Sequence, residues 1–433
     1  MTEKSESSDR PESPCIMFPS LEDAPEIIPS FIGDDSEFHE IIFHDTYMIN
    51  LRTGDFLIPP HSQDIFHIAE RFVSENKPFL TLDSSDLSPD LLSLMSISWH
   101  HHHRVYVNLD LNVLSRLSEI MEGEKACPPD NPKDPNDRKG YERRWALMSL
   151  LSLTYLNSSI SYEILIPEFA SKNGISRTDH LLSNIDSILK MKGHDIMAGL
   201  LNGEFHPDFV KQEHSFPYSI TESTAGGRFI GNYRNMLELA RRIREGESYP
   251  RGSLHLENYM VWLHDNSFRS TAAIFTAMYV FADHNPRSVM KKIRSSKGSG
   301  LLEIVVNQAW DCTHVMNFFN PEAIEGRHLP GEEYITLFIT RDAALRSIIN
   351  SVHDAFFNNI NPFSNHFGSK DSDHIYSLYK ELFDNEKSPD RSYNKESYHY
   401  DEAESIKELE LNLVGECGYI ESIPFSLPSE RRS

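Results

Sequence analysis

Two segments far apart in the chain share one pattern, in which a short apolar run is followed by a polar corner and a helical stripe. The first run spans 105–110, and its length and β-branched residues are typical of a buried strand. Apolar residues at helical spacing follow over 113–121, with Asn112 in a position to cap a helix. The second run spans 334–339, and its helical stripe covers 345–352. Each segment therefore predicts a strand that leads directly into a helix.

An aspartate stands at each of these corners. Asp110 ends the first run, and Asp342 closes the Thr-Arg-Asp turn after the second. In open parallel sheets, ligands bind outside the carboxyl ends of the strands. We therefore expect the two carboxylates to converge at one sheet edge, although 232 residues separate them in the sequence.

The remaining periodicity predicts mostly helices. They are expected at 63–75, 140–157, 178–192, 228–245, 266–283 and 301–319, with short extended runs at 40–43 and 47–50. Two further acids lie in informative settings. Glu168 follows Pro167, a residue typical of a first helical turn. Asp311 shares a helix face with Asn307 and His314, in an otherwise apolar helix.

Charge divides the chain into an acidic periphery and a less acidic body. The 41 Lys and Arg against 65 Asp and Glu give a net charge of −24, so attraction to nucleic acid or an anionic membrane is not the default expectation. We expect a disordered acidic arm at 1–36, a small mixed region at 37–103, an α/β domain at 104–362, and an acidic, weakly structured tail at 363–433 with one helix at 401–413.

The four cysteines lie far apart and form no CxxC pair, so the sequence supports neither a disulfide framework nor a zinc knuckle. The amino terminus lacks the basic start and apolar core of a signal peptide, and no apolar stretch is long enough to span a bilayer. We therefore expect a cytoplasmic protein that does not enter the membrane.

Carboxylates gathered at a sheet edge would repel one another, and the pKa of each would rise unless a cation neutralised them. Mg²⁺ and Mn²⁺ prefer oxygen ligands and suit a carboxylate cluster that faces a phosphate group. Such a metal can polarise a phosphodiester and activate a water molecule. The acids therefore predict hydrolytic chemistry on a phosphate ester.

At this point the chain resembles a known family, the PIN-domain nucleases. The resemblance rests on Val-Tyr-Val-Asn-Leu-Asp-Leu-Asn-Val-Leu-Ser at 105–115, a glutamate at 168, Ala-Trp-Asp at 309–311 and Phe-Ile-Thr-Arg-Asp at 338–342. It implies a PIN-like α/β fold, a parallel sheet flanked by helices. It also implies an endoribonuclease that depends on Mg²⁺ or Mn²⁺, with catalytic and metal-binding roles for Asp110, Glu168, Asp311 and Asp342.

The resemblance covers about 104–172 and 300–355. Glu168 and Asp311 are 143 residues apart, far more than in compact members of the family, so a helical insertion is expected at about 173–300. If the helix begins earlier, Glu163 could replace Glu168. The insertion and the acidic tails are candidate surfaces for a protein partner.

The expected substrate is RNA, with DNA as an open alternative. The segment 285–300 carries five bases and no acid, and Lys291 and Lys292 at its centre are candidate phosphate contacts. Arg341, next to the second corner, has the guanidinium fork that suits a phosphate. Asn112 and Thr340 complete the expected substrate-binding residues.

Two other functions remain open. A haloacid-dehalogenase-like phosphohydrolase would use Asp110 as its nucleophile, although that family's Asp-x-Asp opening has Asn112 here in place of the second acid. A catalytically degenerate PIN-like protein would act instead as a regulator or scaffold. The large insertion and the net acidity motivate this second alternative.

Overall fold

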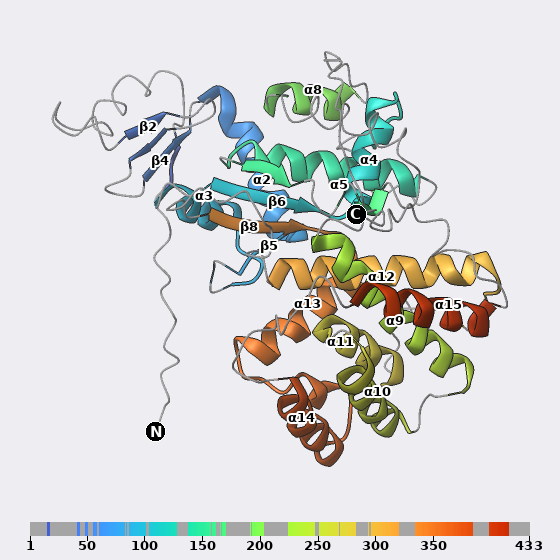
Figure 1. The fold of residues 1–433 in the computed structure, drawn as a ribbon. Helices are drawn as coiled ribbons and strands as arrows, with labels where there is room; N and C mark the ends of the chain where they lie inside the picture. Colours follow the sequence, from blue (N-terminus) through green and yellow to red (C-terminus); the bar gives the residue numbers. More distant parts are fainter. Residues whose placement is uncertain are drawn as a thin grey trace, which may run out of the picture. The chain divides into compact units, whose positions relative to one another are not determined.

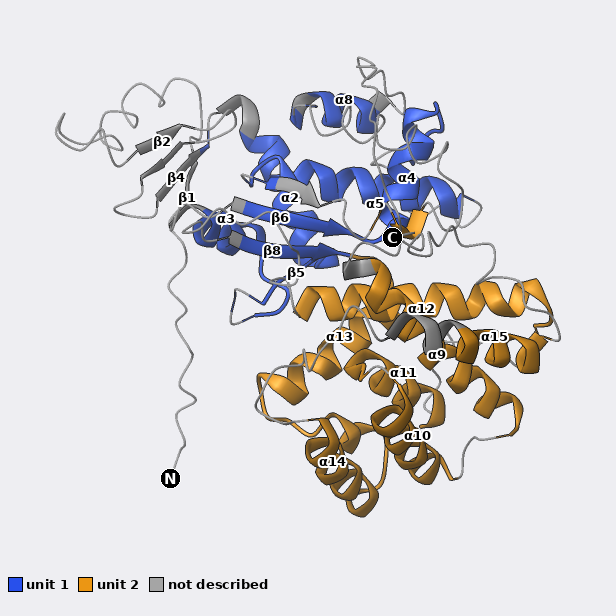
Figure 2. Cartoon of the chain, in the orientation of Figure 1, with its two compact units in different colours: residues 1–161, 180–213, 328–339 blue, residues 162–179, 214–327, 340–433 orange. Residues whose placement is uncertain are grey.

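The computed structural model describes residues 55–127, 137–161, 193–202, 224–246, 251–282, 296–319, 334–383 and 398–414, with gaps at 59, 83, 85, 101–103, 157 and 268. It also describes 15–17, 41–43, 48–50, 165, 167–169, 191 and 293. The chain divides into two compact units (Figure 2). Unit 1 comprises Met1–Ser161, His180–Glu213 and His328–Ile339, and unit 2 comprises Tyr162–Asp179, His214–Arg327 and Thr340–Ser433.

Unit 1 contains two small sheets. The first has the order β1-β4-β3-β2, formed by Cys15–Met17, Asp55–Ile58, Met48–Asn50 and Ile41–Phe43. The second has the order β5-β8-β6-β7, formed by Phe79–Leu80, Tyr334–Ile339, Arg104–Leu109 and Ser158–Ser161. In the second sheet β6 is parallel to both β7 and β8, whereas β5 is antiparallel to β8.

The expected PIN-like α/β fold, with a parallel sheet flanked by helices, is wrong. The described part of the chain is mostly helical, and its second sheet is small and mixed (Figure 1). The two predicted strand-and-helix segments are present, but the rest of the described chain adds few strands to the sheet that they form. The residues between them contribute β7, only four residues long, and then helices.

Five helices accompany these sheets among the described residues of unit 1. They are α2 (Pro60–Asn76), α3 (Leu91–His100), α4 (Leu111–Met121), α5 (Arg138–Leu153) and α8 (Gly193–Asn202). The core combines buried strand residues such as Val105 and Val107 with the stripe of α4, which buries Val113, Leu114, Leu117, Ile120 and Met121. This stripe is the periodicity that the sequence displays, so local pattern and packing agree here.

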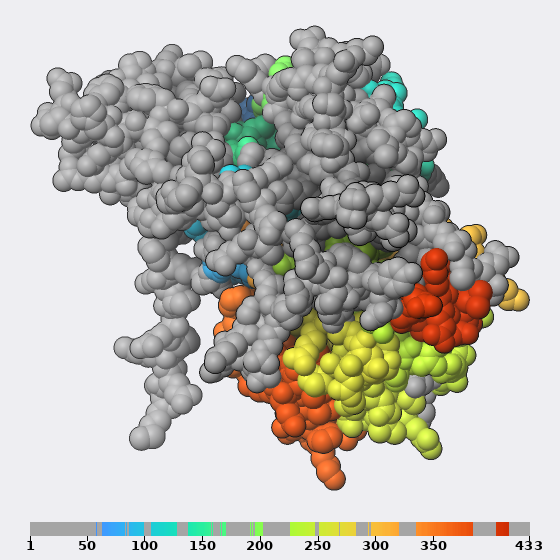
Figure 3. Space-filling model, in the orientation of Figure 1, coloured from blue at the N-terminus to red at the C-terminus, as the bar shows by residue number. Residues whose placement is uncertain are grey.

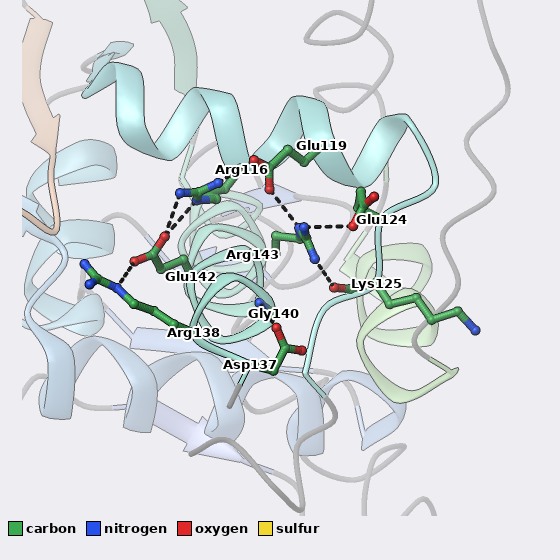
Figure 4. A network of polar contacts seen from close by, with 9 residues as sticks. All are labelled: Arg116, Glu119, Glu124, Lys125, Asp137, Arg138, Gly140, Glu142 and Arg143. Atoms are coloured by element: carbon green, nitrogen blue, oxygen red, sulfur yellow. Dashed lines mark hydrogen bonds and ion pairs between the residues drawn. The ribbon is translucent and has the colours of Figure 1, made fainter. Parts of the chain in front are cut away.

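A network of ion pairs joins α4 and the segment after it to α5 (Figure 4). Arg143 is buried, and it donates hydrogen bonds to Glu119 Oε2 at 2.8 Å and to the Lys125 carbonyl oxygen at 2.9 Å. Its Nη2 also lies 2.9 Å from Glu124 Oε2. Glu142 receives hydrogen bonds from Arg116 and Arg138. Because Arg143 is buried, its partners offset the cost of removing its charge from water.

Unit 2 is a helical assembly. It contains α9 (Thr224–Arg244), α10 (Gly252–Asn266), α11 (Thr271–Phe281), α12 (Ser299–Phe319), α13 (Ala343–Phe356), the 3₁₀ helix η4 (Pro362–Asn365), α14 (Ser369–Phe383) and α15 (Tyr398–Val414). Helices α9 and α12 pack together, with Phe229 stacked on Trp310 at 4.1 Å between ring centroids. The red atoms of α15 lie against α9 in Figure 3. In the interior between these two helices, the Tyr233 hydroxyl donates to Glu410 at 2.7 Å.

Most predicted elements are present, with shifted ends. The helices expected at 63–75, 140–157, 228–245, 301–319 and 401–413 correspond to α2, α5, α9, α12 and α15. The stretch 266–283 contains α11, whereas α10 had no counterpart in the prediction. The helix expected at 178–192 lies outside the described residues. Among the described helices, none is long and apolar enough to cross a membrane.

Candidate functional site

Asp110 directly follows β6, the strand that lies between two parallel neighbours. Its backbone N–H donates to the Ile339 carbonyl at 2.9 Å and extends the pairing of β6 with β8 by one residue. Its side chain is buried, and Oδ1 accepts from the Asn112 N–H at 3.0 Å. Asp110 is therefore the N-cap of α4, a role that the sequence analysis gave to Asn112. The prediction of Asn112 as the cap is wrong, because the helix begins at Leu111.

Asp342 stands in the same local setting after β8. Its Oδ1 accepts from the N–H groups of Ala344 at 2.7 Å and Leu345 at 3.1 Å, so it caps α13. Thr340 is fully buried, and its Oγ1 accepts from the Asp342 N–H at 3.0 Å. Asp342 itself is only half-buried, and its Oδ2 accepts no hydrogen bond from the described part of the chain. One oxygen thus builds the helix start, while the other can receive a cation or a proton.

A half-buried cation reinforces this second corner. Arg346 donates from Nε to the Thr340 carbonyl oxygen at 3.1 Å, and burial lowers the pKa of its guanidinium to about 10. The group is still protonated at neutral pH, so a positive charge lies one turn into α13. Sequence reasoning missed Arg346, since an arginine between apolar helix positions has no distinctive local signal. Arg341, the predicted phosphate contact, is exposed.

Glu168 has a partner that the sequence did not indicate. The His314 Nε2 lies 2.8 Å from Glu168 Oε2, and the two side chains are only 2% and 5% exposed. His314 therefore donates to the carboxylate in the interior of unit 2. This contact offsets the cost of burying the acid, and it also occupies one of the oxygens that a metal would need.

More polar side chains line the packing of α9 against α12. Arg228 donates to Asn317, and Asn232 donates to Thr313 at 3.1 Å, with all four residues buried. The sequence predicts a polar face on α12 at Asn307, Asp311 and His314. In the structure Asn307 is exposed and Asp311 half-buried, so the buried polar face is turned toward Thr313, His314 and Asn317.

The predicted acids are thus each placed, but they do not form one cluster in the described chain. Within the described residues, no group of three or more His, Cys, Asp or Glu side chains could hold a metal ion. In particular, the three acids of unit 2, Glu168, Asp311 and Asp342, do not make such a group. Lys291 and Lys292 lie outside the described residues.

Comparisons with known proteins give no family for this chain. No family model matches it, no curated protein is similar to it, and no solved structure matches its fold.

Proposed function

We propose that this chain is an endoribonuclease that acts in the cytoplasm, requires Mg²⁺ or Mn²⁺, and needs the carboxylates of Asp110 and Asp342. The observation that carries the proposal is the position of Asp110 at the carboxyl end of β6. Strands on both sides of β6 run parallel to it, and this end of a parallel strand is where α/β proteins bind ligands. The substrate class, RNA, is what the resemblance of the motifs at 105–115 and 338–342 to PIN-domain nucleases implies.

Asp342 supports the proposal from the second motif. β8 is aligned with β6 up to the pair Leu109 and Ile339, and Asp342 comes three residues later in the chain. Its Oδ2 is not used in capping, and a single carboxylate oxygen is a suitable ligand for a hard cation. Arg341 is exposed and can contact a substrate phosphate.

The full set of four acids does not fit a metal as they stand. Glu168 is bound to His314, and Asp311 forms no metal-binding group with the other described acids. We therefore assign Glu168 the task of holding α12 through His314. The proposal therefore rests on Asp110 and on Asp342, each taken by itself, as carboxylates that cleavage requires.

The proposal is tested by incubating the purified protein with labelled single-stranded RNA and DNA in the presence of Mn²⁺, Mg²⁺ or EDTA. Asp110→Asn and Asp342→Asn are the informative variants. An asparagine side-chain oxygen still accepts the capping N–H groups, so each variant removes the negative charge and retains the acceptor that starts its helix. We expect cleavage of RNA with metal, and a loss of at least a hundredfold in both variants.

Asp137→Asn is a matched control. Asp137 caps α5 by accepting from the Gly140 N–H at 2.7 Å, but it does not follow a strand. We expect this variant to cleave RNA at the wild-type rate. If Asp110→Asn cleaves as fast as the wild type, or if EDTA has no effect, the proposal is wrong. A phospho-aspartate trapped at Asp110 would indicate a phosphohydrolase, and a protein without any cleavage activity would point to a scaffold.

A further inference from the structure

Helix α9 carries five arginines, of which four have hydrogen-bond acceptors. Arg241 and Arg242 both donate to Glu238, Arg244 donates to the carbonyl oxygens of Ile293 and Ser296, and Arg228 donates to Asn317. Arg234 differs. In the described part of the chain its guanidinium has no hydrogen-bond acceptor and no acidic partner, and its Nε is buried without one.

An aromatic surface lies beside this arginine. The Arg234 Cζ lies 5.9 Å from the centroid of the Trp262 ring, and Trp262 is stacked in turn on Tyr259 at an interplanar angle of 13°. A guanidinium over an aromatic face is held by cation–π attraction. The N–H groups at the edge of the guanidinium can still donate hydrogen bonds. Proteins use such a stacked arginine to bind phosphates and bases.

Hydrogen bonds on either side fix this pair. Asn235, next to Arg234, accepts from the Tyr259 hydroxyl at 2.9 Å and from the Ser267 hydroxyl at 2.5 Å. These bonds tie α10 to α9 on both sides of Trp262, so they hold the backbone that carries the indole beside α9. The arginine and the tryptophan are therefore preorganised rather than loosely exposed side chains.

The pair is also within reach of a ligand. Arg234 and Trp262 are both half-buried, and α10 presents an exposed face, with Leu254 47% and Val261 42% exposed. Helix α10 lies at the surface of unit 2 in Figure 3. Because the Nε of Arg234 is covered, the remaining N–H groups of the fork are those that can donate to a ligand.

We propose that Arg234, held against Trp262, binds a phosphate group of single-stranded RNA. The proposal rests on the proposed ribonuclease function for the identity of its ligand. An acceptor-free guanidinium loses hydrogen bonds with water on folding, and a buried N–H without a partner is unfavourable. A phosphate oxygen from the substrate would restore those bonds, and bidentate contact would make them specific for a planar fork.

The test is fluorescence anisotropy of a labelled 20-nucleotide single-stranded RNA, titrated with the full chain in EDTA so that no cleavage interferes. We expect Arg234→Ala to weaken binding about tenfold and to reduce the slope of log Kd against log salt by about one. Arg234→Lys, which keeps the charge but not the fork, should lose part of this affinity. Thermal melting would verify that each variant is folded.

Arg241→Ala is the matched control, since it removes the same charge from the same helix at a residue already paired with Glu238 and Glu245. Equal weakening by both variants, or none by Arg234→Ala, would overturn the proposal. The proposal would also be overturned if RNA did not bind at Arg234 but a polyglutamate peptide did, with binding lost in Arg234→Ala. Two further outcomes separate this proposal from the proposed ribonuclease function. If cleavage needs Asp110 and Arg234→Ala binds RNA normally, the ribonuclease function stands and the Arg234 site is wrong. If RNA binding needs Arg234 and the protein does not cleave RNA, the Arg234 site stands and the ribonuclease function is wrong.

Discussion

Asp110 and Asp342 have nearly the same backbone conformation, with φ and ψ of −66° and 138° for the first and −71° and 112° for the second. Each accepts N–H groups at the start of a helix, and this alone accounts for an aspartate at that position. Capping and chemistry therefore select the same residue type at a strand end. Only a substitution that keeps the cap and removes the charge separates the two roles, which is why asparagine is the informative replacement.

Cys312 lies in the interior of unit 2 and offers a prediction about pH. Its thiol lies 3.5 Å from the Thr276 hydroxyl, and burial raises its pKa from 9.0 to about 12. Between these values the unfolded chain has lost the thiol proton while the native chain keeps it, so the native state binds more protons and its stability falls as pH rises. At pH 10 this single group should lower the free energy of unfolding by about 1 kcal/mol.

Urea unfolding of the wild type and Cys312→Ala at pH 8 and pH 10 measures this effect. Burial also raises the pKa of Tyr259, so the wild-type slope alone contains other groups. The difference between the two proteins isolates the thiol, since both keep Tyr259. We expect a smaller loss of stability with pH in the variant. Equal losses would show that Cys312 is accessible to water in the native state.

The residue scale also marks the limit of what the sequence reveals. The Glu168 to His314 contact joins positions 146 residues apart, and neither side of it has a local signal for the other. The polar spacing on α12 correctly indicated that its surface is not uniformly apolar. It could not tell which polar residues face inward, because that depends on how α9 packs, with Arg228 and Asn232 brought against α12.

At the scale of elements, periodicity was a good guide where one face of an element is buried. The segments that became β6 with α4 and β8 with α13 were predicted closely, because a buried stripe and a capping residue are local properties. Helix α10 was missed although Leu256, Tyr259, Met260 and Leu263 are buried at helical spacing. Leu254 and Val261 are apolar but exposed, so they weaken the apolar periodicity that would predict this helix.

At the start of α10, the backbone lies very close to the end of α11. A Cβ atom added to Gly252 would lie 2.1 Å from the carbonyl oxygen of Phe281, at the end of α11. That oxygen belongs to the backbone and cannot turn aside as a side chain can. We therefore expect Gly252→Ala to force the two helices apart and to lower the free energy of unfolding by about 1–3 kcal/mol.

Gly300→Ala provides the comparison in urea unfolding experiments. Gly300 lies in the first turn of α12, and a Cβ there meets nothing within 4 Å. Alanine favours the helix over glycine, so this variant should be more stable than the wild type by up to about 1 kcal/mol. If both variants shift the midpoint in the same direction, the close approach at Gly252 does not control how α10 packs.

At the scale of the whole molecule, the sequence predicted the wrong fold class for an identifiable reason. Two strand-and-helix segments with corner aspartates are compatible with a larger parallel sheet, and local pattern does not report how many strands join it. The described chain between them supplies only one strand, β7, together with α5 and α8 of unit 1 and the helices α9 to α12 of unit 2. Long-range packing determines the architecture, and the local sequence pattern of those helices does not predict how they pack.

Net charge makes a prediction for the whole chain. A charge of −24 repels itself more strongly in the compact native state than in the expanded unfolded state, so it destabilises folding. Added salt screens this repulsion at distances beyond about 8 Å at physiological ionic strength. We therefore expect the melting temperature at pH 7.5 to rise by several degrees between 20 mM and 300 mM sodium chloride. RNA binding should weaken over the same range, since contacts with phosphates are lost to competing cations.

A lower pH provides an internal control for that salt effect. The isoelectric point of the sequence is about 5.3, so at pH 5.5 the net charge is close to zero instead of −24. The self-repulsion would then be small, and salt should change the melting temperature much less at pH 5.5 than at pH 7.5. A salt effect of equal size at both values would mean that sodium chloride acts on particular ion pairs, such as those around Arg143, rather than on the overall charge.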